Sequence, residues 1–215
     1  LSYLRSSKEK GTIEFMYKTV GPGLEALSQI KPGDEIRVMG PIGNGFIYPS
    51  SKKSVILIGG GVGIPPVLFM GEELKKANHD IGLVAFFGSE VPFPFQTCKS
   101  SLAMPGVNDS IDTTIDDMEK LGVSCRLSSQ AGYEGCHLGF VTEPAKSFIE
   151  TLSNSQKSET VIYACGPESM LEAVAQLAKE QQLDCMLSLE EHMACAIGGC
   201  AGCTVKVLQD DHEKM

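Results

Sequence analysis

The sequence has 215 residues, with 27 acidic and 18 basic side chains and a formal net charge of −9. This length predicts one or two domains with room for a substantial core. The lack of any Lys/Arg run argues against a nucleic-acid-binding or anionic-membrane surface. Apolar residues come in short, dispersed runs, so neither a transmembrane helix nor a signal peptide is expected.

The first segment, residues 1–50, is expected to be mainly β structure. Residues 12–17 largely alternate polar and apolar side chains, as a half-buried strand does. Residues 24–27 predict a short helix, and residues 35–39 predict a strand after a Pro-Gly turn. Because two or three strands cannot close a core, the segment is expected to be part of a small antiparallel barrel whose first strands are missing.

From residue 54 onward, expected strands and helices alternate. Residues 55–58 are a continuous apolar run, typical of a strand buried on both faces. Further strands are expected at 81–87, 123–127, 160–164 and 185–189. Helices are expected from the turn after the first strand to about residue 77, at 142–152 and at 167–181, with a short helix at 112–121 in a loop-rich stretch. The alternation predicts an α/β domain with a parallel, doubly wound sheet.

The turn after the first of these strands is rich in glycine. Gly59, Gly61 and Gly63 precede Ile64 where a strand passes to a helix, and backbone N–H groups at such a place suit a pyrophosphate. Because the spacing is not strictly G-x-G-x-x-G, the alternative is a tight turn that needs glycine only for packing. The turn 21–23, Gly-Pro-Gly, is a weak candidate for a second phosphate site, and an ordinary turn is the favoured interpretation.

A cysteine stands at the end of the strand expected at 160–164. Cys165, Gly166 and Pro167 lie between this strand and a helix, hence at the carboxyl edge of the sheet, where open α/β sheets bind ligands. A thiol at this edge can face a cofactor ring. The alternative is that Cys165 serves as a small buried apolar side chain.

Three cysteines near the end form the pattern C-x₄-C-x₂-C. Cys195, Cys200 and Cys203 have the spacing with which plant-type ferredoxins begin to hold a [2Fe–2S] cluster, and glycines between them allow sharp turning. A fourth thiolate is expected beyond the end of this sequence. One alternative is structural zinc with His192 or His212, although paired C-x₂-C motifs are more usual for zinc. A less favoured alternative is three thiols without a metal. The other five cysteines show no disulfide framework, which favours a reducing cytoplasm.

In this order, these motifs resemble the ferredoxin-NADP⁺ reductase-like superfamily. More closely, they resemble the electron-transfer subunit of type B dihydroorotate dehydrogenase (the PyrK family), with residues 187–203 as the most specific match. The resemblance implies a partial antiparallel FAD-binding β-barrel at 1–50, a parallel doubly wound NAD-binding domain at 51–187 and an incomplete C-terminal [2Fe–2S] module at 188–215.

The resemblance also implies roles for individual residues. It places the following residues at the cofactors: Leu1 and Ser2 beside the flavin, Gly21 and Gly23 at the FAD pyrophosphate, Gly59, Gly61, Gly63 and Ile64 at the NAD pyrophosphate, Cys165, Gly166 and Pro167 at the nicotinamide, and Cys195, Cys200 and Cys203 on iron. Of these, Cys165 is the candidate catalytic residue. The resemblance implies NAD rather than NADP, and the small number of basic residues near a 2′-phosphate site gives weak support, with Arg126 as the main exception.

The function that the resemblance implies is electron transfer in pyrimidine biosynthesis. Electrons from dihydroorotate would pass from an FMN-containing catalytic subunit, expected as the partner in a heterotetramer, through the cluster and FAD to NAD⁺. Two alternatives remain open from the sequence. One is another NAD(P)H-dependent flavin and iron–sulfur reductase subunit, serving a hydrogenase or a sulfur reductase, and the other is a zinc-stabilised nucleotide-binding regulator.

Overall fold

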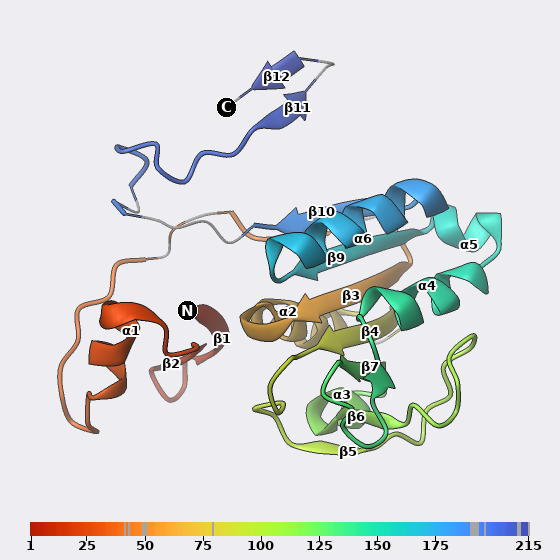
Figure 1. Cartoon of the computed structure of the whole chain (residues 1–215), viewed down its shortest axis with the longest axis horizontal. Helices are drawn as coiled ribbons and strands as arrows, with labels where there is room; N and C mark the ends of the chain where they lie inside the picture. The colour runs from red at the N-terminus through yellow and green to blue at the C-terminus, as the bar shows by residue number, and fades with distance from the viewer. Residues whose placement is uncertain are drawn as a thin grey trace.

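The structure is a computed structural model that describes residues 1–40, 42, 44–48, 51–78, 80–189, 194–195, 197–209 and 212–214. Its centre is a six-stranded parallel sheet with helices on both faces (Figure 1). An N-terminal antiparallel hairpin lies against one side of this α/β body, and the C-terminal segment extends away from it (Figure 1). None of the described helices is long and apolar enough to cross a membrane.

The six strands follow the order β10-β9-β3-β4-β7-β8, and every neighbouring pair is parallel. The strands are β3 (Ser54–Gly60), β4 (Gly82–Gly88), β7 (Ser124–Ser129), β8 (His137–Leu138), β9 (Thr160–Cys165) and β10 (Asp184–Ser188). All residues of β9 are buried, as are all but the first of β3. The doubly wound parallel sheet expected from the sequence is therefore confirmed, and β8 is an edge strand that the sequence pattern did not reveal.

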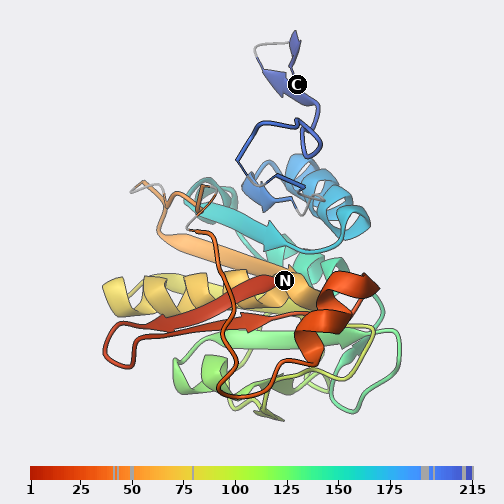
Figure 2. The ribbon, with the colours of Figure 1, turned by 90° about the vertical axis from the view of Figure 1, so that its left-hand side faces the viewer.

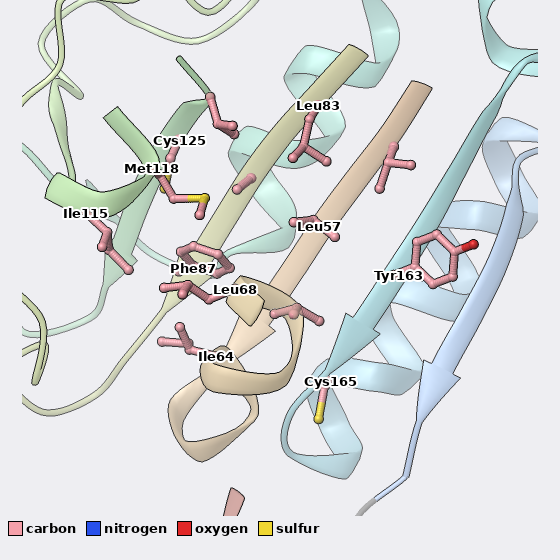
Figure 3. Packing of buried hydrophobic residues seen from close by; sticks show 14 of the residues in the cluster. Leu57, Ile64, Leu68, Leu83, Phe87, Ile115, Met118, Cys125, Tyr163 and Cys165 are labelled. Carbon is pink, nitrogen blue, oxygen red and sulfur yellow. The ribbon is translucent and has the colours of Figure 1, made fainter. Parts of the chain in front are cut away.

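Helices cover the two faces of the sheet and enclose two cores. They are α2 (Ile64–Ala77), α3 (Asp116–Lys120), α4 (Thr142–Glu150), α5 (Asn154–Ser158) and α6 (Glu168–Gln181), with the 3₁₀ helix η1 (Gly61–Gly63) before α2. Alternate residues of β3 point to opposite faces. Leu57 belongs to the core beneath α2 and α3 (Figure 3), whereas Ile56 belongs to the core beneath α4 and α6.

The N-terminal segment consists of β1 (Ser2–Ser7) paired with β2 (Thr12–Met16), followed by α1 (Gly21–Ser28). The prediction of a strand at residues 35–39 is wrong. These residues are all exposed and pair with no strand among the described residues, so their alternation of side chains faces no core. Within the part of the barrel expected at 1–50, the structure therefore describes one hairpin and one helix.

The loop-rich stretch before β7 contains more β structure than expected. β5 (Thr97–Lys99) and β6 (Thr113–Ile115) form a two-stranded antiparallel sheet, so the helix expected at 112–121 is confined to α3. The β-branched run that makes up β6 favours an extended backbone, which delays the start of the helix. A second small hairpin, β11 (Val207–Gln209) with β12 (His212–Lys214), lies in the C-terminal segment.

The segment that leads into the α/β body is fastened to the sheet by aromatic residues. The hydroxyl of Tyr163 on β9 donates a hydrogen bond to the carbonyl oxygen of Ile47 at 2.6 Å, and its ring meets Phe46 edge-on at 5.1 Å. Because Tyr163 is fully buried, this contact connects the preceding segment to the centre of the sheet.

Candidate functional site

The strands β3 and β9 lie side by side, and the chain leaves them in opposite directions. α2 follows β3 onto one face of the sheet, and α6 follows β9 onto the other. The carboxyl ends of the two strands therefore form a topological switch point, and open α/β sheets bind ligands in the crevice at such a point. The glycine turn 59–63 and residues 165–167 are brought together at this point, about 100 positions apart in sequence, as the two loops at the ends of β3 and β9 show (Figure 3).

Two of the glycines are required for packing. A Cβ atom on Gly63 would lie 2.3 Å from the carbonyl oxygen of Cys165 and 2.5 Å from the amide nitrogen of Gly166. A Cβ on Gly59 would lie 2.8 Å from Val67 and 2.9 Å from Phe87. The packing interpretation of the glycine turn is therefore correct for these two positions, since no larger side chain fits there without displacing neighbours.

Gly61 is different, because it faces open space. Its φ is +54°, in the left-handed region that favours glycine, and nothing lies within 4 Å of a Cβ built on it. It begins η1, at the start of the helical segment that continues as α2, so the backbone here is accessible and adjoins a helix N-terminus. This combination fits the phosphate of a dinucleotide, because N–H groups and the helix dipole favour negative charge.

Cys165 ends β9 with 2% of its surface exposed, and its side chain belongs to the core beneath α2 (Figure 3). Sequence reasoning missed its neighbour Met170, in the first turn of α6. The thioether of Met170 covers the glycines beside it: its sulfur lies 2.6 Å from a Cβ built on Gly60, and its methyl carbon lies 2.5 Å from one built on Gly166. The signal was a long, unbranched apolar side chain four residues after Gly166, where a helix turn folds back over the crevice.

The N-terminus of α1 is a second place with accessible N–H groups. The helix begins at Gly21 with φ +73°, and its N-cap residue Val20 makes no side-chain cap. Nothing lies within 4 Å of a Cβ built on Gly21 or Gly23. The turn therefore has the open space that a phosphate needs, at a helix N-terminus that no side chain caps. Of the two residues expected beside the flavin, Leu1 is 60% exposed and Ser2 is buried in β1.

The cysteine loop surrounds one sulfur with backbone donors. Hydrogen bonds from the N–H groups of Ile197 and Cys200, with smaller help from Gly199, lower the pKa of Cys195 to about 6. A thiolate is the form that ligates iron, and N–H donors to sulfur are typical around iron–sulfur clusters. Two backbone turns in the left-handed region, at Gly198 and Ala201, shape the loop.

The three sulfurs are not gathered into a ready-made ligand set. Cys200 is exposed, Cys203 is half-buried, and no group of three His, Cys, Asp or Glu side chains among the described residues is arranged to hold a metal ion. His192, the residue weighed as a zinc ligand, lies outside the described residues. The fit of the loop to a thiolate-ligated cluster thus rests on its sulfur donors and on the N–H groups around Cys195, and no preformed ligand set among the described residues contributes to it.

Arg126 is not available to a 2′-phosphate. Only 6% of its surface is exposed, and its guanidinium donates to the carbonyl oxygens of Cys125 at 2.8 Å and Leu102 at 2.6 Å. Arg126, the one basic residue weighed against NAD, thus gives no support to NADP. Its cation instead stabilises the loop beside β7 from a buried position.

This chain is similar to known proteins in both sequence and fold. Residues 190–215 match the family model of the iron–sulfur cluster binding domain of dihydroorotate dehydrogenase B. The electron transfer subunit of dihydroorotate dehydrogenase B (NAD(+)) from Clostridium perfringens is 33% identical over 90% of this chain and 67% of its own length. The subunit from Listeria welshimeri is 34% identical over the whole chain and 73% of its own length.

Two solved structures share the fold. An NADH-dependent reduced ferredoxin-NADP oxidoreductase has a TM-score of 0.69 at 23% identity, over 97% of this chain and 66% of that one. A ferredoxin reductase of carbazole 1,9a-dioxygenase has a TM-score of 0.60 at 17% identity, over 86% and 53%. The chain spans about two thirds of the length of the clostridial relatives that it matches, 67% and 65%. At this identity and coverage, the chain belongs to the family of dihydroorotate dehydrogenase B electron transfer subunits.

Proposed function

We propose that this protein is the electron-transfer subunit that passes electrons from dihydroorotate oxidation, carried out by an FMN-containing catalytic subunit, to NAD⁺ in pyrimidine biosynthesis. The observation that carries the proposal is that one chain combines the glycine turn at the edge of the sheet with a cysteine loop that favours a thiolate. The chain also belongs to the family of dihydroorotate dehydrogenase B electron transfer subunits. When bound, FAD supplies hydride chemistry and a [2Fe–2S] cluster supplies single-electron chemistry.

We assign three parts to this function: an FAD-binding part at 1–50, an NAD-binding part at 51–187 and a cluster module at 188–215. In the first part, Gly21 and Gly23 would offer backbone N–H groups to the FAD pyrophosphate, with Leu1 and Ser2 beside the flavin. Support comes from the uncapped N-terminus of α1 and the open space around both glycines.

In the NAD-binding part, Gly61 would approach the dinucleotide phosphates, while Gly59, Gly63 and Ile64 hold the turn in shape. Cys165 would end the crevice near the nicotinamide. Gly166 and Pro167 would keep β9 and the start of α6 close enough to form its wall, since Pro167 lies 3.0 Å from a Cβ built on Gly60. The burial of Arg126 supports NAD over NADP, because a 2′-phosphate needs a free cation.

In the cluster module, Cys195, Cys200 and Cys203 would be ligands of iron. The N–H groups that surround the sulfur of Cys195 would hold it as a thiolate. We also propose a cytoplasmic location. All eight cysteines lie in the described part of the chain and none forms a disulfide, which is usual in a reducing compartment.

The first experiment tests the cluster. The natural full-length subunit is purified anaerobically, alone and with its catalytic subunit, and its absorption spectrum and its iron and zinc contents are measured. Cys200→Ser is expected to lose visible absorption and iron. Cys98→Ser is the matched control, because Cys98 is a partly exposed cysteine on β5, outside the loop. Colourless wild-type protein with stoichiometric zinc would refute the electron-transfer function.

The second experiment tests the partner. NAD⁺ reduction by dihydroorotate is measured with the catalytic subunit alone and after addition of this subunit. Added subunit is expected to confer NAD⁺ reduction and to co-purify with the catalytic subunit. If it does neither, a reductase subunit of another system, such as one serving a hydrogenase or a sulfur reductase, replaces the proposed function.

A further inference from the structure

Strand β1 has an irregular register where it contacts α2. Tyr3 is paired with Phe15 and Arg5 with Glu14, so Leu4 is an extra residue without a partner on β2, as in a β-bulge. In a regular strand, successive side chains point to opposite faces. A bulge breaks this alternation and re-aims the side chains beside it.

As a result, three consecutive residues of β1 engage the same side of the α/β body. The ring of Tyr3 meets Phe69 of α2 edge-on, with centroids 4.9 Å apart. Leu4 packs against the core that lies beneath α2. Arg5 reaches Glu72, three positions after Phe69 and hence on the same side of α2. Figure 2 shows β1 and β2, in red, alongside α2.

The polar part of this contact joins three separate segments. Nε of Arg5 donates to both carboxylate oxygens of Glu72 at 3.1 and 3.2 Å, and Nη2 donates to Glu72 as well as to Asp117 of α3 at 2.6 Å. Glu72 is a buried acidic residue, with 8% of its surface exposed. A buried carboxylate needs its counter-charge, and the planar fork of arginine matches two carboxylate oxygens where lysine does not.

This contact connects the two cofactor-binding parts of the proposed function. α2 is a continuous helix whose first residue, Ile64, directly follows the glycine turn. Of the two residues assigned to the flavin, Ser2 begins β1 and Leu1 directly precedes it. The position of β1 along α2 therefore determines how far the flavin strand lies from the glycine turn. Hydride transfer depends steeply on such a distance, because a misplacement of about 1 Å can reduce a rate roughly a hundredfold.

We propose that Arg5 is a positioning residue for hydride transfer: through Glu72 and Asp117 it fixes the bulged strand β1 on α2 and so sets the spacing between flavin and dinucleotide. This inference rests on the proposed function. Arg5 acts through the spacing of the two parts and contributes no atom to the reaction.

The test uses the intact FAD-containing holoenzyme and three changes: Arg5→Met, Arg5→Lys and Glu72→Gln. Lys120→Met is the matched control, because it removes an ion pair with Asp116 on neighbouring α3 that does not involve β1. Three quantities are measured: hydrogen–deuterium exchange of the β1 amides, the limiting rate of flavin reduction by NADH, and the NADH dissociation constant.

Arg5→Met and Glu72→Gln are expected to speed exchange in β1 at least tenfold and to lower the limiting rate roughly tenfold to a hundredfold. The dissociation constant should change less than threefold, because the glycine turn is intact. Arg5→Lys should fall between Met and wild type, and Lys120→Met should match wild type. The charge-swapped double variant Arg5→Glu with Glu72→Arg should recover part of the rate, which a loss of folding alone does not predict.

Three results would overturn the proposal, and they distinguish its failure from that of the proposed function. If exchange in β1 rises while the limiting rate stays at the wild-type value, or if exchange does not change, Arg5 has no positioning role and the proposed function stands. If the flavin of the wild-type holoenzyme is not reduced by NADH at all, the proposed function fails, and the positioning role fails with it.

Discussion

Replacing Gly63 by alanine tests how the crevice is built. A Cβ atom at this position would lie 2.3 Å from the carbonyl oxygen of Cys165, 2.4 Å from its carbonyl carbon and 2.5 Å from the amide nitrogen of Gly166. All three are backbone atoms, which have no rotamer by which to move aside. Since φ of Gly63 is −83°, the backbone itself accepts alanine, so the effect comes from the contact alone.

The size of the effect follows from the shift required. Moving the contact from 2.3 Å to an ordinary 3.4 Å separates the glycine turn from the end of β9 by roughly 1 Å. Overpacking of this kind costs about 2–3 kcal/mol of unfolding free energy. For a chain of this size, that corresponds to a fall of roughly 4–12 °C in melting temperature. Because the turn itself moves, NADH affinity should fall at the same time.

Thermal unfolding of Gly63→Ala is therefore compared with that of Gly45→Ala. A Cβ on Gly45 meets nothing within 4 Å, so this control should stay within about 0.5 kcal/mol of wild type. NADH titration of both variants follows the effect on binding. Equal melting temperatures for the two variants would refute the close approach of the turn to β9 and, with it, the packing role of Gly63.

Three further predictions concern buried groups. Arg126→Met should cost about 1–3 kcal/mol, because it removes the hydrogen bonds that the guanidinium donates to the carbonyl oxygens of Cys125 and Leu102. The ratio of NADH to NADPH affinity should not change, and a changed ratio would show that this cation meets the cofactor. Burial raises the pKa of Cys125 from 9.0 to about 11, so between these pH values the unfolded chain loses a proton that the folded chain keeps. The free energy of unfolding should therefore fall by about 2–3 kcal/mol as pH rises through this range. Urea unfolding at several pH values should show a smaller dependence of this free energy on pH in Cys125→Ala, and an unchanged dependence would contradict the prediction. Tyr163→Phe should lower the free energy of unfolding by about 1 kcal/mol and make the segment near Ile47 more sensitive to proteolysis. If the variant is cleaved there at the same rate as wild type, the 2.6 Å hydrogen bond is not what holds this segment.

Much of the α/β body follows from local sequence pattern. The apolar run in β3 predicted a strand buried on both faces, and alternation of strands with amphipathic segments predicted the parallel, doubly wound sheet. The short helix after residue 23 was also correct, although α1 begins three residues earlier, at Gly21. These features depend on residues close together in the chain, which is why they can be read without the fold.

The expected strand at residues 35–39 shows the limit of such patterns. Alternation of side chains describes a strand only if a partner strand and a core are present, and here the residues are exposed. The bulge at Leu4 escaped prediction for a related reason. A bulge is defined by the register between two strands, and register belongs to the pair.

The sequence by itself determined the family-like order of motifs, the C-x₄-C-x₂-C spacing and the place of the glycine turn between strand and helix. Only the tertiary structure decided what each of these residues does. It separated Gly61, which faces open space, from Gly63, which packs against β9 about 100 residues away, and it enclosed the Arg126 cation within the core. The physical reason is that spacing fixes which backbone conformations are open to a residue, whereas burial and charge partners come from segments that are distant in sequence and meet only in the fold.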